Sequence, residues 1–289
     1  TDASRYLDIG ELLYSLRSIH RHLSWINKIY IVTDNQVPKW LNTHRTKLKL
    51  VNHTTIIPKK FLPTFNSNTI EFYIHKIPGL SEHFIYFNDD VFIAKNLPKS
   101  QFFTEDGLCY FPVSPNDWEK RDMLLEKYRS VNKNDMGSIQ YKFISLNSYK
   151  SFYNKFRKDI PYTSAHSYMP LTKTLMNSML KHFSSEIEHV SSHRFRDFTD
   201  VNLALMAIFV GCGLGYAVPN TNHNASILVT LDSGVNKKLR KIDLDYYAAF
   251  CLNSGEKTLR FSLKKAHAFL ETVFKVRSPY EFKEYHIRF

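Results

Sequence analysis

Residues 84–92 read FIYFNDDVF, and this stretch decides the fold class of the chain. An apolar run over 84–87 ends at Asn88-Asp89-Asp90, and a second apolar run over 91–94 follows directly. Aromatic and β-branched residues favour buried strands, whereas Asn and Asp favour the turns that join them. The stretch therefore predicts two buried strands, with a pair of carboxylates where the first strand ends.

The segments before this stretch alternate between the helical and the extended pattern. Leucine and isoleucine at helical spacing predict a helix over 10–24, and the apolar residues 70–77 predict a second, shorter helix. The apolar run 28–33 and the alternating run 47–51 predict strands. Helices and strands that alternate over short connections indicate an α/β fold.

The sequence changes character after the second strand of this stretch. Lys, Ser, Asn and Tyr dominate residues 118–190, with apolar residues at helical intervals. This pattern predicts a helical, substrate-facing insertion within a single catalytic domain that spans 1–289. A closing amphipathic helix is predicted over 260–275.

The longest uncharged stretch, residues 201–231, contains the most apolar helix of the chain. A strong helix is predicted over 199–210, with Thr199 as its N-cap. Asn, Gly and Pro residues interrupt the stretch before it reaches the roughly 18 apolar residues that a membrane span requires. We therefore predict a buried helix followed by a strand rather than a transmembrane segment.

The charge of the chain narrows the class of partner. There are 39 Lys+Arg against 27 Asp+Glu, a net charge of +12, and residues 236–242 (NKKLRKI) form a basic patch. Such a surface favours an anionic partner. Zinc-finger spacing and RNP-like runs are absent from the sequence, so nucleic acid is not expected. A phosphorylated small molecule or an anionic polymer fits better.

The absence of several well-known sequence motifs excludes the kinds of enzyme that depend on them. The sequence contains no Walker loop, GxGxxG, GxSxG, HExxH or CxxC. The three cysteines are too few and too scattered for a disulfide framework or a zinc site, which favours a reducing compartment.

Asp89 and Asp90 are the strongest candidates for chemistry. Ligands of α/β proteins usually bind where strands end, and a charge there is unfavourable unless it faces a site. The pair could hold a divalent cation that bridges a nucleotide diphosphate, or one acid could act as a general base. The alternative is a β-turn, for which Asn-Asp-Asp is equally suitable.

Two further candidates lie upstream and in the middle of the chain. Asn66 and its neighbours could cap a helix and expose amides to a sugar or phosphate, and Glu71 is a solitary acid in an apolar helix. The alternative is a capping motif with Glu71 in solvent. His166 lies in a loop-like stretch, where a lone histidine is more often structural.

The last candidates precede the apolar helix. Arg194 and Arg196 come before a segment whose first turn carries Asp200. Arginine binds phosphate in a bidentate manner, and helix N-termini attract anions. A surface network of Arg and Asp is the alternative.

Several of these segments jointly resemble one family. They are RYLDIGELLYSLRSIHRHLSWINKIYIVTDNQVPKWL (5–41), LPTFNSNTIE (62–71), IPGLSEHFIYFNDDVF (77–92), HRFRDFTDVN (193–202), AFCLN (249–253) and FLETVFKVRSPYEF (269–282). They are similar to segments of the Stealth proteins, which are bacterial capsular-polysaccharide phosphotransferases with an animal relative, N-acetylglucosamine-1-phosphotransferase. The resemblance covers most of the chain.

The resemblance implies a nucleotide-sugar-transferase-like (GT-A-like) sheet flanked by helices, and it also implies an activity and its residues. Family members transfer a sugar-1-phosphate from a UDP-sugar to a hydroxyl, which forms a phosphodiester and releases UMP. The implied catalytic residues are Glu71, Asp90, His166 and Arg196. To these we add substrate contacts at Asn66, Asn88, Arg194 and Arg17, and Mg²⁺ or Mn²⁺ at Asp89, Asp90 and Asp200. The expected partners are a UDP-sugar donor and an anionic polysaccharide acceptor.

The sequence departs from the family pattern at two places, and two rival functions stand beside the one that the resemblance implies. The family's opening Trp-Val-Asp-Gly-like motif is absent, so we expect the N-terminal strand to be missing, and the usual Asn-Asp of a later block reads Asn253-Ser254. The rivals are a metal-dependent glycosyltransferase that releases UDP and a non-catalytic module that binds anionic polysaccharide. We expect a cytoplasmic location, at the inner face of the bacterial membrane through peripheral association.

Overall fold

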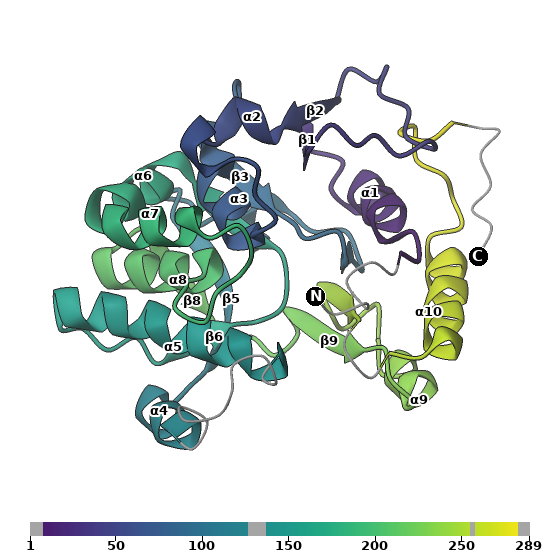
Figure 1. The fold of residues 1–289 in the computed structure, drawn as a ribbon. Coiled ribbons are helices and arrows are strands. Elements are labelled where there is room, and N and C mark those ends of the chain that lie inside the picture. Colours follow the sequence, from purple (N-terminus) through teal and green to yellow (C-terminus); the bar gives the residue numbers. More distant parts are fainter. Residues whose placement is uncertain (1–7, 127–136, 255–257, 283–289) are drawn as a thin grey trace.

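The computed structural model describes residues 8–126, 137–254 and 258–282 as a mixed α/β protein (Figure 1). The helices are α1 (Glu11–His22), α2 (His53–Ile56), α3 (Ser67–Tyr73), α4 (Trp118–Glu126), α5 (Gly137–Phe156), α6 (Lys173–His182), α7 (Ser184–Ser192), α8 (Leu203–Leu214), α9 (Val235–Leu239) and α10 (Arg260–Val273). The strands are β1 (Ile29–Thr33), β2 (Leu48–Asn52), β3 (His83–Tyr86), β4 (Val91–Ile93), β5 (Cys109–Pro115), β6 (Tyr162–Ser164), β7 (Met169–Thr172), β8 (Ala217–Asn220), β9 (Ser226–Thr230) and β10 (Ala249–Asn253). Short 3-10 turns are formed by Lys59–Phe61, Ile74–Lys76 and Lys99–Gln101.

The strands pair as short sheets rather than as one long ladder. β1 runs parallel to β2, β5 lies between parallel β8 and antiparallel β6, and β3 pairs antiparallel with β7. β10 lies between parallel β9 and antiparallel β4. Parallel neighbours need crossover connections, and the chain supplies them, for example through α9 between β9 and β10. The predicted α/β class is confirmed.

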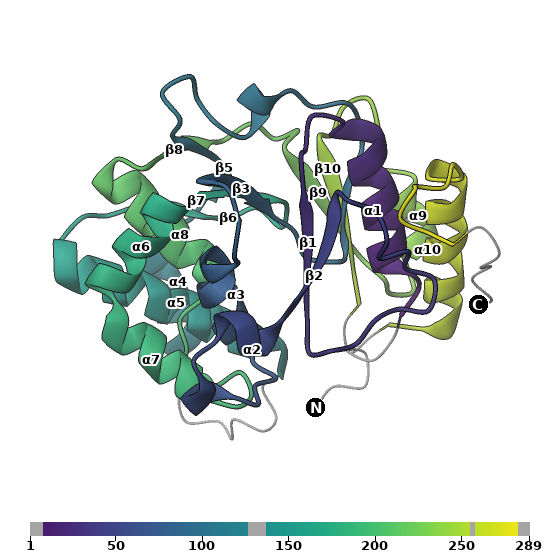
Figure 2. The ribbon, with the colours of Figure 1, turned by 90° about the horizontal axis from the view of Figure 1, so that it is seen from above.

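The described residues form three hydrophobic cores, and the two largest lie on the two sides of these strands. Figure 2 shows α5, α6, α7 and α8 gathered on one side and α1, α9 and α10 on the other, with the strands between. The first core packs large side chains such as Phe111, Phe152 and Phe209. The second core contains Phe92 and Phe250. Each core buries its own faces of the strands and helices, so both must form to give the complete fold.

The segment 84–92 connects these two cores. β3 pairs with β7 and packs Phe84 and Tyr86 against the first core. β4 pairs with β10 and buries Phe92 in the second core. The acidic turn 88–90 therefore lies where the chain passes from one core to the other.

The remaining patterned elements form close to where the sequence places them. The helices expected over 10–24 and 260–275 are α1 and α10, and the strands expected over 28–33 and 47–51 are β1 and β2. The helix expected over 70–77 begins earlier, at Ser67. The side chain of Asn66 accepts a hydrogen bond from the Asn68 backbone N–H and caps this helix.

Two expectations for the second half are corrected. Residues 118–190 are not purely helical, because β6 and β7 lie within them and pair with β5 and β3. The N-cap of α8 is Asn202, whose side chain accepts from the Leu205 N–H at 3.3 Å, so Thr199 is not the cap. The Thr199 hydroxyl donates to Asp197 Oδ1 at 2.6 Å instead.

The apolar helix α8 is buried, as predicted, and β8 follows it. Residues 205–210 have no exposed surface. Among the described residues, no helix combines the length and the apolar character that a bilayer crossing requires.

Close packing of α8 against α5 requires glycine at position 213. A Cβ atom built on Gly213 would lie 2.3 Å from Cζ of Phe152, which is fully buried. Alanine favours the helix by up to about 1 kcal/mol over glycine. Overpacking of this kind usually destabilises by about 1–3 kcal/mol.

We therefore expect Gly213→Ala to lower the free energy of unfolding, measured by urea denaturation. Combining it with Phe152→Leu should make the effect of the alanine smaller than in the wild-type background. An unchanged or higher stability of the single variant would contradict this packing.

Candidate active site

Three separate segments meet at Asp90. The carboxylate of Asp90, the imidazole of His166 and the thiol of Cys251 place their ligand atoms within 4.8 Å of one another. His166 lies in the loop between β6 and β7. Cys251 lies on β10, directly opposite Val91 in the ladder. The pairing of β4 with β10 thus brings Cys251 to the acidic turn.

The hydrogen bonds of Asp90 are incomplete within the protein. Asn253 Nδ2 donates to Asp90 Oδ2 at 3.2 Å. Asp90 Oδ1 is buried and has no N–H or O–H partner among the described residues. Buried polar atoms without partners are rare and often mark a ligand position. One oxygen of Asp90 is therefore available to a proton, a cation or a substrate hydroxyl.

Burial and the charge of Asp90 both disfavour a negative charge on its neighbours Cys251 and Asp89. Burial, followed by the charge of Asp90 and a hydrogen bond to it, raises the pKa of the Cys251 thiol well above its usual range. Cys251 is thus a neutral thiol that can donate to Asp90. Loss of surrounding water, followed by the charge of Asp90, raises the pKa of Asp89.

A second cluster forms at the start of α3. Arg196 Nε donates to Ser67 Oγ at 3.0 Å, which holds the guanidinium beside this helix. Glu71 lies further along α3 and is 8% exposed. Burial raises the pKa of Glu71 from 4.5 to about 7, against the opposing effects of Arg196 and of a hydrogen bond with Tyr86. Glu71 therefore changes its charge near neutral pH, next to Arg196.

Tyr86 connects the two clusters. Its hydroxyl donates to Asn88 Oδ1 at 2.6 Å and also lies within hydrogen-bond reach of Glu71. Burial, followed by the charge of Glu71, raises the pKa of Tyr86 well above its usual value. The predicted catalytic residues are thus brought together by contacts that run from Arg196 through Glu71 and Tyr86 to the acidic turn.

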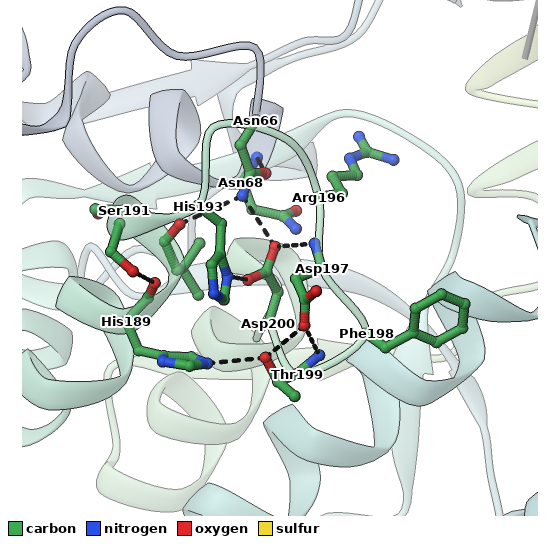
Figure 3. A network of polar contacts seen from close by, with 12 residues as sticks. Asn66, Asn68, His189, Ser191, His193, Arg196, Asp197, Phe198, Thr199 and Asp200 are labelled. Carbon is green, nitrogen blue, oxygen red and sulfur yellow. Dashed lines mark hydrogen bonds and ion pairs between the residues drawn. The ribbon is translucent and has the colours of Figure 1, made fainter. Parts of the chain in front are cut away.

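The loop that carries Arg196 is fixed by a buried network (Figure 3). Asp200 has no exposed surface, and its Oδ1 lies 2.7 Å from His193 Nδ1. Asp200 Oδ2 accepts from Asn66 Nδ2 at 2.9 Å and from the Asp197 N–H at 3.0 Å. The network therefore ties the N-cap of α3 to the loop before α8.

Side chains of α5 hold the same loop from its other side. Gln140 Nε2 donates to the Arg196 carbonyl at 2.8 Å, and Asn147 Nδ2 donates to the Phe198 carbonyl at 2.8 Å. These bonds satisfy loop carbonyls that no helix or strand would satisfy. The backbone of Arg196 is consequently fixed before any ligand binds.

Three residues that the sequence suggested for binding have structural contacts instead. Asn66 is fully buried, and both its amide atoms are used, for the cap and for Asp200. Both carboxylate oxygens of Asp200 are likewise used. Arg17 donates to Glu281 at 2.8 and 2.6 Å and to the Phe274 carbonyl at 2.8 Å. We leave Asn66 and Arg17 out of the proposed substrate contacts, and Asp200 out of the proposed metal site.

The structure places three residues at the site that the sequence did not suggest as site residues: Tyr86, Cys251 and Asn253. Cys251 and Asn253 are two positions apart on β10 and therefore share one face of the strand. The sequence shows this spacing, but it does not show that β10 pairs with β4. Tyr86 stands in the apolar run before the acidic turn, where it was taken only as a core residue.

The titration of Glu71 predicts a pH-dependent stability. The unfolded chain ionises this acid near pH 4.5, whereas the folded chain retains the proton until about pH 7. Stability should therefore fall as the pH rises through this interval, by about 3 kcal/mol for this group alone. Glu71→Gln should remove this part of the decrease, measured as urea unfolding between pH 4 and 8, and should keep the part that comes from Glu11, whose burial raises its pKa to about 8. The exposed Glu105→Gln serves as control and should retain the decrease; the same decrease in Glu71→Gln would exclude this titration.

The buried Asp200 network predicts a large loss of stability when one carboxylate oxygen of Asp200 is replaced by an amide NH₂. In Asp200→Asn, an amide NH₂ would face one of the present donors and the buried charge would be lost. We expect a loss of about 3 kcal/mol or more in the free energy of unfolding. Asp232 also accepts several hydrogen bonds, but near the surface, so Asp232→Asn should change the stability much less. Equal effects of the two substitutions would argue against the buried network.

The sequence is similar to those of known proteins. Residues 5–111 match the profile of Stealth protein CR2, conserved region 2. The chain is 41% identical over 203 residues to a capsular polysaccharide phosphotransferase of Haemophilus influenzae, an alignment that covers 70% of this chain and 53% of the relative. The chain thus spans about half the length of that relative and of a similar one from Actinobacillus pleuropneumoniae, which is 37% identical over 205 residues and 71% of this chain.

A longer match extends over nearly the whole chain. A capsular polysaccharide phosphotransferase of Neisseria meningitidis serogroup B is 32% identical over 286 residues, covering 96% of this chain and 74% of the relative. This alignment includes the acidic turn, the His166 loop, the Arg196 loop and β10 together. The chain therefore belongs to the Stealth protein family, as these matches to conserved region 2 and to capsular polysaccharide phosphotransferases establish.

Proposed function

We propose that the protein transfers a hexose-1-phosphate, such as N-acetylhexosamine-1-phosphate, from a UDP-sugar to a hydroxyl of a growing anionic polysaccharide. The reaction forms a phosphodiester and releases UMP. The observation that carries this proposal is the meeting of Asp90 and His166 in one cluster that Tyr86 connects to Glu71 and Arg196. The names of the relatives support the same reaction class.

The reacting atoms define what each residue must do. The oxygen of the acceptor hydroxyl forms a bond to the phosphorus that carries the sugar, and the bond from that phosphorus to the oxygen of UMP breaks. The hydroxyl proton passes to Asp90 or His166, whose ligand atoms are within 4.8 Å of each other and act as one acid–base pair. Phosphoryl transfer otherwise depends mainly on positioning and on charge neutralisation.

The second cluster supplies that positioning. Arg196, fixed by its backbone and by Ser67, neutralises charge on the transferring phosphoryl oxygens, and the exposed Arg194 assists it. Glu71 orients a hydroxyl of donor or acceptor. Asn88 offers an exposed amide to sugar or phosphate.

A divalent cation, Mg²⁺ or Mn²⁺, fits beside this pair. The buried Asp90 Oδ1 without an N–H or O–H partner is suited to a cation, and Asp89 is adjacent. The cation would neutralise diphosphate charge.

The setting of this reaction is part of the proposal. We assign the sheets and their flanking helices to a GT-A-like nucleotide-sugar-transferase arrangement. We place the protein in the cytoplasm, peripherally attached to the inner face of the membrane, where its net charge of +12 favours anionic partners. Nucleic acid is not among the proposed partners.

The nucleotide that is released tests the proposal. Full-length protein is incubated with UDP-sugars, Mg²⁺ or Mn²⁺ and capsule-type oligosaccharides, and the products are separated by chromatography. We expect UMP, and we expect Asp90→Asn to reduce its rate of formation by about 100-fold or more while acceptor affinity changes little. Asp232→Asn should keep the wild-type rate. Release of UDP would identify attack at the anomeric carbon and make the protein a conventional glycosyltransferase.

A further inference from the structure

Two phenylalanines lie stacked on the surface beside the candidate site. Phe65 is 60% exposed and Phe195 is 52% exposed. Their ring centroids are 5.3 Å apart, and the ring planes differ by 13°. Large aromatic side chains gain stability from burial, so an exposed aromatic pair beside a site indicates a binding surface.

The positions of both rings are determined by residues of the site. Phe65 directly precedes the α3 N-cap, which is bound to Asp200, and Phe195 directly precedes Arg196, which is bound to Ser67. The Phe65 N–H donates to the Arg194 carbonyl at 2.8 Å, which joins the two segments. These contacts fix the backbone that carries both rings, so the rings are placed side by side before a ligand arrives.

A cation lies over the same aromatic surface. The guanidinium carbon of Arg194 is 5.7 Å from the centroid of the Phe65 ring, and the side chain is exposed. The surface thus offers an apolar ring face together with an exposed positive charge, a short distance along the chain from Arg196. A ligand that matches it has an apolar face and a negative charge close together.

We propose that Phe65, Phe195 and Arg194 form a binding platform for one repeat of the anionic polysaccharide acceptor. The C–H face of a pyranose ring would lie on the aromatic pair, and the adjacent phosphodiester would contact Arg194. The identity of the acceptor rests on the proposed function. Small ligands such as a nucleotide are usually enclosed over most of their surface, whereas these rings are more than half exposed, as suits a long chain that lies along a surface.

Binding without turnover tests the platform. The affinity of full-length protein for an immobilised octamer of phosphodiester-linked N-acetylhexosamine is compared with its affinity for UDP-N-acetylglucosamine in solution. We expect Phe195→Ala to weaken octamer binding about tenfold, equivalent to the loss of one good contact, and to leave the nucleotide affinity unchanged. Phe195→Trp should retain octamer binding. Arg194→Gln should weaken it and make it less sensitive to salt.

Phe261 on α10 provides a matched control. It is also 52% exposed, and Lys265 lies 5.3 Å from its ring centroid, so it has the same exposure and the same kind of cation contact. Phe261→Ala should bind the octamer as the wild type does. Thermal unfolding of each variant separates lost binding from lost folding, and Phe65→Ala serves as the second platform variant.

Several outcomes would overturn the proposal. Wild-type protein that does not retain the octamer would exclude this acceptor, and platform variants that bind the octamer normally would show that a different surface receives it. A loss of UDP-N-acetylglucosamine affinity instead would assign the rings to the donor. Because these measurements require no transfer, release of UDP rather than UMP would disprove the proposed function and leave the platform result standing.

Discussion

The carboxylate of Asp200 is fully buried and accepts hydrogen bonds from three different parts of the site. A buried charge is unfavourable unless donors surround it, so the folded state requires Asn66, His193 and the Asp197 N–H to converge. That requirement fixes two things at once. It sets the start of α3, which carries Glu71, and it sets the loop that carries Arg196. The geometry of the side that we propose binds phosphate therefore follows from one carboxylate that has no contact with substrate in the proposed reaction.

Local sequence was sufficient for elements whose residues interact within a few positions. The spacing of α1, the apolar run of β3 and the acidic turn after it could all be read directly, because period and turn chemistry are local properties. The choice of Thr199 as the cap of α8 was wrong for a related reason. Thr199 and Asn202 are both good capping residues, but the Thr199 hydroxyl donates to Asp197 two positions away, and the helix begins only at Leu203 with Asn202 as its cap.

The roles of polar residues were harder to predict than their positions. A sequence shows that Asp200, Asn66 and Arg17 have ligand-type side chains, but it does not show whether the fold already uses them. Arg17 and Glu281 are 264 positions apart, and their ion pair became visible only when α1 packed beside the C-terminal segment. Cys251 was missed for the converse reason, because its closeness to Asp90 depends on the pairing of β10 with β4. The resemblance to a family singled out the catalytic candidates, and the structure supplied Tyr86 as the contact between them.

The two-core arrangement has a consequence for synthesis of the protein. The second core packs Leu13 and Leu16 of α1 against Leu270 and Phe274 near the other end of the described chain. A ribosome-bound chain can complete the first core once α8 and β8 have emerged, but α1 has to wait for α10. Asp90 lies between the two cores, and Cys251 also appears late. A nascent chain would therefore leave Asp90 without its neighbour Cys251 until β10 has been translated, and α1 with an uncovered apolar face until α10 has followed.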